Sequence, residues 1–384
     1  MNTPLTYPYG EIQSEDQAKK LALAIARLGA GFVTPNPAVG CVILNQEKKL
    51  IGLGYHRKFG SDHAEVEALN DCISRSGCDA LKNATVFVTL EPCGHVGKTQ
   101  SCAHLLASFP LRTVVFGSSD PNPKVLGKGL EYLRSQNIKI AQDLIWAQET
   151  DRINAVFFHW IKHQTPYVAV KIATDFTECM GSRTTLPQKP TTITPKIIQL
   201  EAHALRQEYD AICVGIQTVF TDNPHLTNRS SNTPLTRNPI RIVLDPSDKM
   251  RKSEQSFNVL DLTLAPTIIV ISPSNIPTDL SNEFSTLKIK MHDGHFDLPV
   301  LLKNLNEHFH IYSILVEGGA RTLGEFFNQK CVHKLYQYKN LSNLCISNPI
   351  YWQDQIKVNF NLQPITNKLF PDQNCQLLEF QVEF

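Results

Sequence analysis

Runs of apolar residues alternate with amphipathic stretches along most of the chain, a pattern typical of buried strands joined by helices. In the first half, strands are expected at residues 39–44, 50–56, 85–90 and 113–117. Helices are expected at residues 14–28, 63–70, 102–108 and 144–162, the first opened by a capping box of Ser14 and Gln17. This half is therefore predicted to be an α/β sandwich around one central sheet.

The second half shows the same alternation and is predicted to be a second α/β domain. Its buried strands are expected at residues 167–173, 210–215, 240–245, 267–272 and 313–317. Gly318-Gly319 precedes a helix expected at residues 322–327, and such a pair either lets the backbone approach a phosphate or forms a tight turn. The predicted organisation is a loose leader at residues 1–13, a first domain at 14–163 and a second domain at 164–384.

The composition indicates a globular protein without a strong charge. The chain has 384 residues, of which 42% are hydrophobic, enough for two packed cores. Its 37 basic and 36 acidic side chains give a net charge of +1 without a basic block, which argues against nucleic-acid binding. No signal-peptide pattern and no apolar run long enough to span a membrane are present. The ten scattered cysteines fit a reducing compartment, so a cytoplasmic location is expected.

The motif that carries chemistry is His63-Ala64-Glu65, followed by Pro92-Cys93 and then Cys102. One imidazole and two thiolates supply three zinc ligands and leave the fourth tetrahedral position for water, whose pKa the metal lowers. Glu65 is the candidate to take a proton from that water and pass it to a leaving amino group. Zinc-dependent nucleobase deaminases use this arrangement, so the sequence predicts a hydrolytic deaminase with one Zn²⁺ per chain.

A closed, purely structural zinc site is the alternative, because such sites use four protein ligands. Cys41 is the candidate for the fourth, although it lies in an apolar run where a buried, unligated thiol is the commoner outcome. A site of that kind would make the first domain a zinc-stabilised, non-enzymatic interaction module. The positions of Glu65 and Pro92 beside the ligands favour the catalytic interpretation.

Eight residues separate Cys93 from Cys102, where nucleotide- and RNA-editing deaminases typically have two. This spacer and three further segments resemble the bifunctional riboflavin-biosynthesis deaminase–reductase family. The segments are Thr-Pro-Asn-Pro-Ala-Val-Gly-Cys-Val at residues 34–42, Gly52-x-Gly54-x-His56, and Asp120-Pro121-Asn122-Pro123. The family usually has two prolines before the second cysteine, where this chain has Gln100 and Ser101.

The resemblance continues into the second half, at residues 205–206, 214–219, 222–229 and 316–319. It implies a cytidine-deaminase-like α/β/α sandwich followed by a dihydrofolate-reductase-like α/β domain. The implied reactions are deamination of a phosphoribosylamino-pyrimidine and then NADPH-dependent reduction of its ribosyl arm to ribityl. The implied substrate-binding residues are Asn36, Arg206, Leu226, Arg229 and Glu317. The implied cofactor-binding residues are Thr174, Thr218, Asp222 and Gly319.

The second half departs from the family pattern in three places. A lengthened segment at residues 174–183 stands where the family has a Leu-Asp-Gly turn, and Thr-Thr-Ile-Thr at 191–194 stands where it has Trp-Ile-Thr. The family's Pro-x-x-x-Gly segment is not evident in residues 334–352. A deaminase with a degenerate, non-catalytic reductase domain is therefore a further alternative.

The expected partner is a small phosphorylated pyrimidine, with neither nucleic acid nor membrane. The resemblance also implies a homo-oligomer, a dimer or larger.

Overall fold

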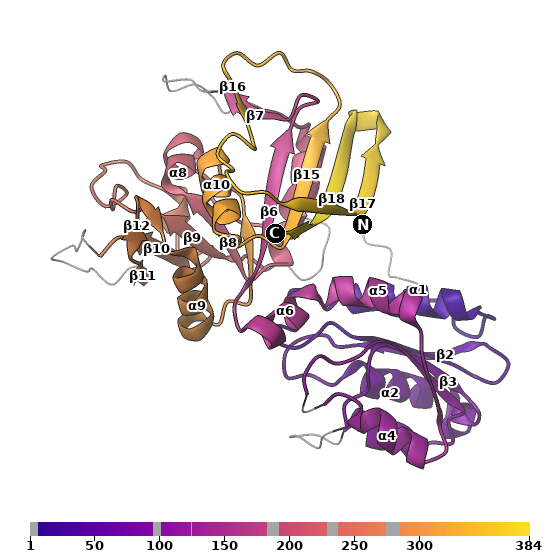
Figure 1. The fold of residues 1–384 in the computed structure, drawn as a ribbon. Coiled ribbons are helices and arrows are strands. Elements are labelled where there is room, and N and C mark those ends of the chain that lie inside the picture. Colours follow the sequence, from indigo (N-terminus) through magenta and orange to yellow (C-terminus); the bar gives the residue numbers. More distant parts are fainter. Residues whose placement is uncertain (1–6, 95–100, 124, 183–191, 229–236, 274–284) are drawn as a thin grey trace. The chain divides into compact units, whose positions relative to one another are not determined.

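A computed structural model of the chain describes residues 7–94, 101–123, 125–182, 192–228, 237–273 and 285–384. The chain divides into two compact units, Met1–Gln164 and Thr165–Phe384, each with its own hydrophobic core (Figure 1). The division lies one residue beyond the boundary placed from the sequence. In the described part of the chain, no helix combines the length and apolar character needed to cross a membrane.

Unit 1 is built on a mixed five-stranded sheet in the order β2-β1-β3-β4-β5. Its strands are β1 (Gly40–Leu44), β2 (Leu50–Tyr55), β3 (Thr85–Leu90), β4 (Thr113–Ser118) and β5 (Lys139–Gln142). Its α-helices are α1 (Glu15–Arg27), α2 (Ala64–Ser76), α3 (Cys102–Ala107), α4 (Lys128–Ser135), α5 (Leu144–Ile153) and α6 (Ala155–His163). Strand β1 is antiparallel to both neighbours, whereas β3, β4 and β5 run parallel.

Helices cover both faces of this sheet (Figure 1). On β1, Cys41 and Ile43 belong to the core formed with α2, α3 and α4, while Val42 and Leu44 belong to the core formed with α1 and α5. A strand buried on both faces is apolar throughout rather than alternating, as β1 is. Unit 1 is thus the predicted α/β/α sandwich.

The capping box at the start of α1 is present: Ser14 Oγ accepts from the Gln17 N–H, and the Gln17 side chain accepts from the Ser14 N–H. The expected loose leader is docked over its described residues, 7–13. Tyr9 and Ile12 form β-bridges to Leu50 and Lys49, and the Tyr9 hydroxyl donates to Asp71 at 2.6 Å.

The helix expected at residues 144–162 is broken in two at Asn154. Asn154 has backbone angles of φ −99° and ψ 16°, outside the α-helical range, and it forms the C-cap of α5. Its side-chain amide is engaged with a distant backbone segment, a tertiary contact that helical periodicity cannot reveal. Helix α4 and strand β5 were not expected from the sequence.

Unit 2 is built on a nine-stranded sheet in the order β11-β10-β9-β8-β14-β6-β15-β18-β17. Its strands are β6 (Tyr167–Thr174), β8 (Ala211–Gly215), β9 (Ile240–Leu244), β10 (Thr267–Ile271), β11 (Ser285–Lys288), β14 (Ser313–Val316), β15 (Lys334–Asn340), β17 (Asn361–Phe370) and β18 (Cys375–Glu383). Two small pairs lie apart from this sheet: β7 (Cys179–Ser182) with β16 (Pro349–Tyr351), and β12 (Met291–His292) with β13 (His295–Phe296). Its α-helices are α7 (Lys196–Ala204), α8 (Ile216–Asp222), α9 (Leu298–Phe309) and α10 (Ala320–Asn328).

The strands from β11 to β15 run parallel, and β18 and β17 add an antiparallel edge. Apolar residues of α9 and α10 pack on one face of the sheet, and Val219 of α8 belongs to the core on the other face. In parallel strands the carboxyl ends lie at one edge, where α/β proteins place their ligands. The ends of β8, β14 and β6 are therefore neighbours, because these strands pair in that order.

Candidate functional sites

Three side chains of unit 1 converge from different elements to form a possible metal site. His63 is the N-cap of α2, Cys93 follows β3, and Cys102 is the first residue of α3. His63 Nδ1 lies 3.2 Å from Cys102 Sγ and 3.8 Å from Cys93 Sγ, and the three ligand atoms all lie within 4.8 Å of one another. One imidazole and two sulfurs at these separations fit the first coordination shell of a tetrahedral zinc ion.

The pKa shifts of the three groups reflect their close approach. A hydrogen bond to Cys93 raises the pKa of His63 to about 9, so a metal would displace a proton from the ring. A hydrogen bond from Cys102 lowers the pKa of the Cys93 thiol; burial opposes this shift, and a hydrogen bond from His63 adds to it. The pKa of Cys102 is raised because it shares a proton with Cys93 and is buried. One sulfur is therefore ready to bind as a thiolate, and a metal would displace the proton held by the other.

Cys41, the sequence-derived candidate for a fourth ligand, lies elsewhere. It is fully buried in the apolar core with Ile43, Ala68 and Leu69, and burial raises the pKa of its thiol. Within the described ranges, the group of side chains able to hold a metal ion has three members and does not include Cys41. None of the other described residues therefore joins these three as a fourth ligand, and an open fourth position is what a catalytic zinc site has.

Glu65 lies in the first turn of α2, beside this group. Its side chain is buried, and burial, with the nearby Cys93 sulfur, raises its pKa to about 7. A carboxyl group with a pKa near neutrality can both accept and release a proton at physiological pH. This is the property that a proton shuttle requires.

Close packing of α2 on the sheet brings Glu65 into place. A Cβ atom added to Gly54 would lie 2.4 Å from the Ala68 backbone nitrogen, and one added to Gly52 would lie 2.5 Å from the Ala68 oxygen. Both glycines belong to β2, so a side chain at either would push α2 away. This is the physical reason for the two glycines in the Gly52-x-Gly54-x-His56 segment.

Asn36 is connected to the possible metal site through His56. Asn36 Nδ2 lies 3.3 Å from His56 Nε2, and His56 Nδ1 lies 2.9 Å from the Asp62 carbonyl oxygen. The carbonyl can only accept, so Nδ1 donates to it and Nε2 accepts from Asn36. The His56 ring also makes an edge contact with the His63 ring, with centroids 5.5 Å apart. Sequence reasoning used His56 only as part of a motif and missed this orienting role.

Glu91, next to Pro92 and Cys93, was recognised in the sequence only as part of the Glu91-Pro92-Cys93 segment, without a role of its own. Its buried carboxylate accepts from the Gly127 N–H at 2.5 Å and from the Asp120 N–H at 3.4 Å. It therefore ties the loop after β4 to the segment that carries Cys93. A buried carboxylate between a strand end and a loop is a tertiary arrangement that its sequence position does not indicate.

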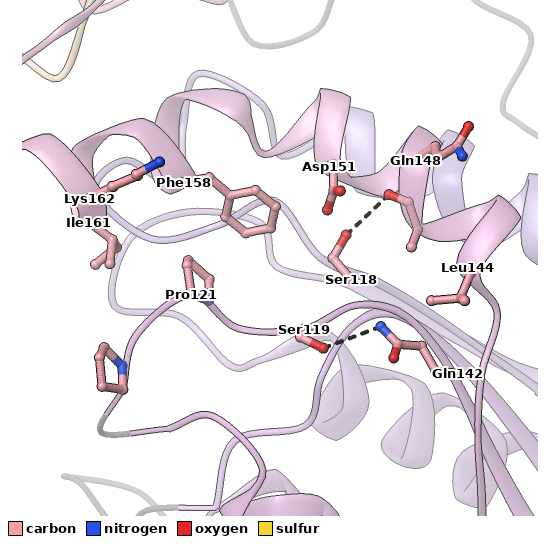
Figure 2. Close-up of a pocket in the computed structure, with 12 residues that line it drawn as sticks. Ser118, Ser119, Pro121, Gln142, Leu144, Gln148, Asp151, Phe158, Ile161 and Lys162 are labelled. Carbon is pink, nitrogen blue, oxygen red and sulfur yellow. Dashed lines mark hydrogen bonds between the residues drawn. The ribbon is translucent and has the colours of Figure 1, made fainter.

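A separate hollow of about 750 Å³ lies between the α5–α6 helices and the loop after β4 (Figure 2). Phe158, Ile161 and Pro121 contribute apolar surface to it. Three of its polar side chains are hydrogen-bonded within the protein: Ser118 Oγ donates to the Ala147 oxygen at 3.4 Å, and Gln142 Nε2 donates to Ser119 Oγ at 3.2 Å (Figure 2). None of the three possible metal ligands lines this hollow.

In unit 2, Arg206 and Glu317 form a buried ion pair. Arg206 Nε donates to Glu317 Oε1 at 2.8 Å, and NH2 donates to Oε2 at 3.0 Å. The Arg206 NH1 donates to the Thr227 oxygen at 2.8 Å, and Lys171 Nζ lies 3.4 Å from Glu317 Oε2. Burial raises the pKa of Glu317, but the cations of Arg206 and Lys171 outweigh it and hold the pKa well below its usual range. Lys171 was not singled out from the sequence.

Several of the other implied residues of unit 2 lie at or just after the ends of β6, β8 and β14. Thr174 ends β6 and accepts from Gln337 Nε2 at 3.0 Å, while Gly319 is the N-cap of α10, just after β14. Thr218 and Asp222 belong to α8, which begins where β8 ends. Leu226 has a left-handed backbone (φ 54°) and a side chain buried in the core below this edge. Arg229 lies outside the described residues.

The segment where the family turn was expected is an ordered turn between β6 and β7. Asp175 Oδ1 accepts from the Thr177 N–H, the Thr177 hydroxyl and the Cys179 N–H, at 2.7 to 3.0 Å. Glu178 follows in the left-handed region (φ 70°), and its carboxylate accepts from Gln337 Nε2 at 2.6 Å and from Trp352 Nε1 at 3.0 Å. Glu178 also forms an ion pair with Lys339.

Comparison with known proteins connects both units to characterised families. Residues 12–118 match the family described as the cytidine and deoxycytidylate deaminase zinc-binding region, and residues 181–339 match the RibD C-terminal domain. The chain is 37% identical over 310 residues to the riboflavin biosynthesis protein RibD of Aquifex aeolicus, covering 81% of this chain and 82% of that protein. It is 34% identical to the RibD protein of Bacillus amyloliquefaciens, covering 84% of each.

Solved structures give the same relationship. The diaminohydroxyphosphoribosylaminopyrimidine deaminase/5-amino-6-(5-phosphoribosylamino)uracil reductase of Thermotoga maritima is similar with a TM-score of 0.78 and 28% identity, covering 95% of this chain and 97% of that one. RibD of Acinetobacter baumannii is similar with a TM-score of 0.78 and 26% identity, covering 96% and 98%. The similarity thus extends over both units.

Proposed function

The chain belongs to the RibD family of riboflavin-biosynthesis proteins, and from this premise we propose which of its residues carry the two reactions. It is an enzyme of riboflavin biosynthesis that combines a deaminase and a reductase and uses zinc and NADPH. No similarity favours a degenerate reductase domain or a non-enzymatic zinc module. The substrate proposed for both reactions is a small phosphorylated pyrimidine.

In the deaminase unit, His63, Cys93 and Cys102 would hold zinc, which when bound supplies the Lewis acid that makes hydroxide available near neutral pH. Glu65 takes a proton from the attacking water and passes it to the amino group, so that the carbon–nitrogen bond breaks and ammonia leaves. Asn36 binds the edge of the pyrimidine. His56 supports this role because it accepts one Asn36 N–H and leaves Oδ1 and the second N–H for the substrate.

The observation that carries this proposal is the buried Glu65 beside three possible ligands on separate elements. The test is Glu65→Gln, with Glu67→Gln as the matched control, because Glu67 lies in the same helix turn but pairs with Arg57 at the surface. The Glu65→Gln protein should keep one zinc per chain and lose deaminase turnover by about 10²- to 10⁴-fold. The control should retain turnover. A Glu65→Gln protein that deaminates at the normal rate would overturn the assignment.

In the reductase unit, Arg206, Leu226, Arg229 and Glu317 are proposed to hold the substrate. NADPH supplies the hydride, and the protein positions it against the sugar. Glu317 supports the substrate role because it fixes the plane of the Arg206 guanidinium, which still has N–H groups to offer a phosphate. Thr174, Thr218, Asp222 and Gly319 are proposed to contact the cofactor. This is supported by Thr174, Thr218 and Gly319, which lie at or just after the ends of β6, β8 and β14, where α/β proteins bind such ligands.

Thr218→Val tests the cofactor assignment, with Thr221→Val on the same helix as its control. Losing one hydrogen bond to the cofactor should raise the KM for NADPH about fivefold, because a neutral hydrogen bond contributes about 1 kcal/mol. The control, whose hydroxyl accepts from Gln217, should leave this KM unchanged. If the KM for NADPH is the same in the two variants, Thr218 does not contact the cofactor.

The boundaries of the two domains, the assembly and the location are part of the same proposal. We propose a deaminase domain ending near residue 164, a homo-oligomer and a cytoplasmic location. All ten cysteines are free thiols, which supports a reducing compartment. Light scattering of the purified chain tests the assembly: a mass near 43.1 kDa, that of one chain, would contradict it.

A further inference from the structure

Ser101, the residue directly before Cys102, stands where the family usually has a proline. It is 1% exposed, with backbone angles of φ −66° and ψ 147°. These angles lie within the range that proline imposes. Ser101 thus adopts the backbone conformation that a proline would impose. Because serine does not restrict its own backbone in this way, contacts with other residues must stabilise that conformation.

Those contacts come from His104. Ser101 Oγ accepts from the His104 N–H at 3.2 Å, which makes Ser101 the N-cap of α3. Ser101 Oγ also lies 2.5 Å from His104 Nδ1, so the same hydroxyl is bound by the histidine ring. The ring stacks on Tyr132 of α4, with centroids 3.8 Å apart and planes at 23°. Ser101 is therefore connected through His104 to a second helix.

The first turn of α3 determines where the Cys102 sulfur lies. The Cys102 N–H donates to Cys93 Sγ at 3.3 Å, and the Ala103 N–H donates to the Cys93 oxygen at 3.1 Å. Cys102 Sγ in turn lies 3.2 Å from His63 Nδ1. Helix α3 has six residues, too few to be stable without outside contacts. A change in its first turn would thus move one proposed ligand and the hydrogen bond to another.

We propose that Ser101 and His104 form a hydrogen-bonded brace that positions Cys102 for zinc, in place of the rigid proline of the family. This inference rests on the proposed ligation of zinc by Cys102. Both are positioning residues, since neither is proposed to touch the metal or the substrate. Partners outside the first ligand shell typically change metal affinity by about 10- to 100-fold when removed.

The test measures zinc affinity of the full chain by competition with a chromophoric chelator. Ser101→Ala should weaken zinc binding about tenfold. Ser101→Pro should recover most of that loss, because proline restrains φ near the observed value. Ser108→Ala is the matched control. Ser108 is the C-cap of α3, and its hydroxyl donates to the Leu105 oxygen at 2.7 Å. The Ser108→Ala protein should bind zinc as tightly as the wild type.

Two further measurements separate the brace from simple helix capping. Glycine is a good N-cap, so Ser101→Gly should keep the thermal stability of the zinc-free protein, yet the brace predicts the same weakened zinc binding as Ser101→Ala. The cobalt-substituted protein should show an altered thiolate-to-metal absorption band in both variants. The Ser101→Gly protein provides the same test if Ser101→Ala does not fold.

Wild-type zinc affinity in both Ser101→Ala and Ser101→Gly would overturn the brace. A failure of the underlying ligand assignment gives a different result: the wild type would hold no zinc, or Cys102→Ser would bind it as tightly as the wild type. The two failures are therefore distinguishable in one set of titrations.

Discussion

The side-chain amide of Asn154 forms two hydrogen bonds with the backbone of Ala38, which lies 116 residues earlier in the chain. The Ala38 N–H donates to Asn154 Oδ1 at 2.8 Å, and Asn154 Nδ2 donates to the Ala38 oxygen at 3.0 Å. Both residues are buried. The contact connects the junction of α5 and α6 to the loop that carries Asn36, two residues before Ala38.

Replacing Asn154 should loosen this loop without disturbing the metal ligands. Asn154→Ala leaves two buried backbone groups without partners, so the free energy of unfolding of unit 1 should fall by about 2 kcal/mol. The deaminase KM should rise while zinc content stays at one per chain. Urea unfolding and steady-state kinetics measure the two effects, with exposed Asn70→Ala as the control. An unchanged deaminase KM would show that the loop carrying Asn36 keeps its position without the Asn154–Ala38 hydrogen bonds.

The same contact shows what the sequence could not reveal. Periodicity predicts one continuous helix over residues 144–162, because nothing local marks Asn154 as a break. Its partner is a backbone group in a distant loop, and such pairing has no signature in spacing. The buried strands were predicted well, since a run such as residues 39–44 is apolar enough to be covered on both faces. Strands β17 and β18 at the sheet edge were missed; β17 is largely exposed, so neither face of the sheet imposes an apolar run on it.

The candidate site, too, contains residues that the sequence predicts and residues that only the structure identifies. Residue types and spacing reveal His63, Glu65, Cys93 and Cys102, because zinc chemistry limits which side chains can serve. Supporting residues such as His56 and Ser101 act through hydrogen bonds to neighbours, a role that many polar residues can fill. Their contribution becomes visible only when the folded distances are known.

The Arg206–Glu317 pair should make the stability of unit 2 depend on pH. The folded-state pKa of Glu317 is held below its unfolded value, which is about 4.3. The pair's contribution is therefore fully present above that value and is lost progressively as the pH falls below it. Glu317→Gln leaves Arg206 as a buried cation without its counter-charge and should cost about 3 kcal/mol at pH 7. The difference in free energy of unfolding between the wild type and Glu317→Gln should become smaller below pH 4.

Urea unfolding at several pH values measures this difference. Glu201→Gln is the control, because Glu201 pairs with Lys368 near the surface and should contribute at most about 1 kcal/mol. A Glu317→Gln deficit that stays constant down to pH 3 would mean that the carboxylate charge does not stabilise the fold.

Glu178 should hold the turn after β6 in place despite its unfavourable backbone. A non-glycine residue in the left-handed region costs about 1 kcal/mol, so Glu178→Gly removes that strain. It also leaves the Trp352 and Gln337 donors without their shared acceptor, which costs about 1–3 kcal/mol for each buried group. The net expectation is lower stability of unit 2 and a higher KM for NADPH, since Gln337 also binds Thr174.

Deaminase activity is the internal control for this variant, because Glu178 and its partners all belong to unit 2. Glu178→Gln, which keeps one acceptor oxygen, should lie between the wild type and the glycine variant. Greater stability of Glu178→Gly than of the wild type would show that backbone strain outweighs the hydrogen bonds.

Removing zinc should abolish one activity and spare the other. The three proposed ligands belong to unit 1, and unit 2 has its own apolar core, so its folding does not depend on the metal. Treatment with a strong chelator should therefore stop deamination while NADPH oxidation with the deaminated substrate continues. Added zinc should restore deamination in the wild type but not in Cys93→Ala, whereas Cys41→Ala should regain it, because Cys41 lies in the core rather than at the metal. Parallel loss of both activities on chelation would show that the reductase requires the metal after all.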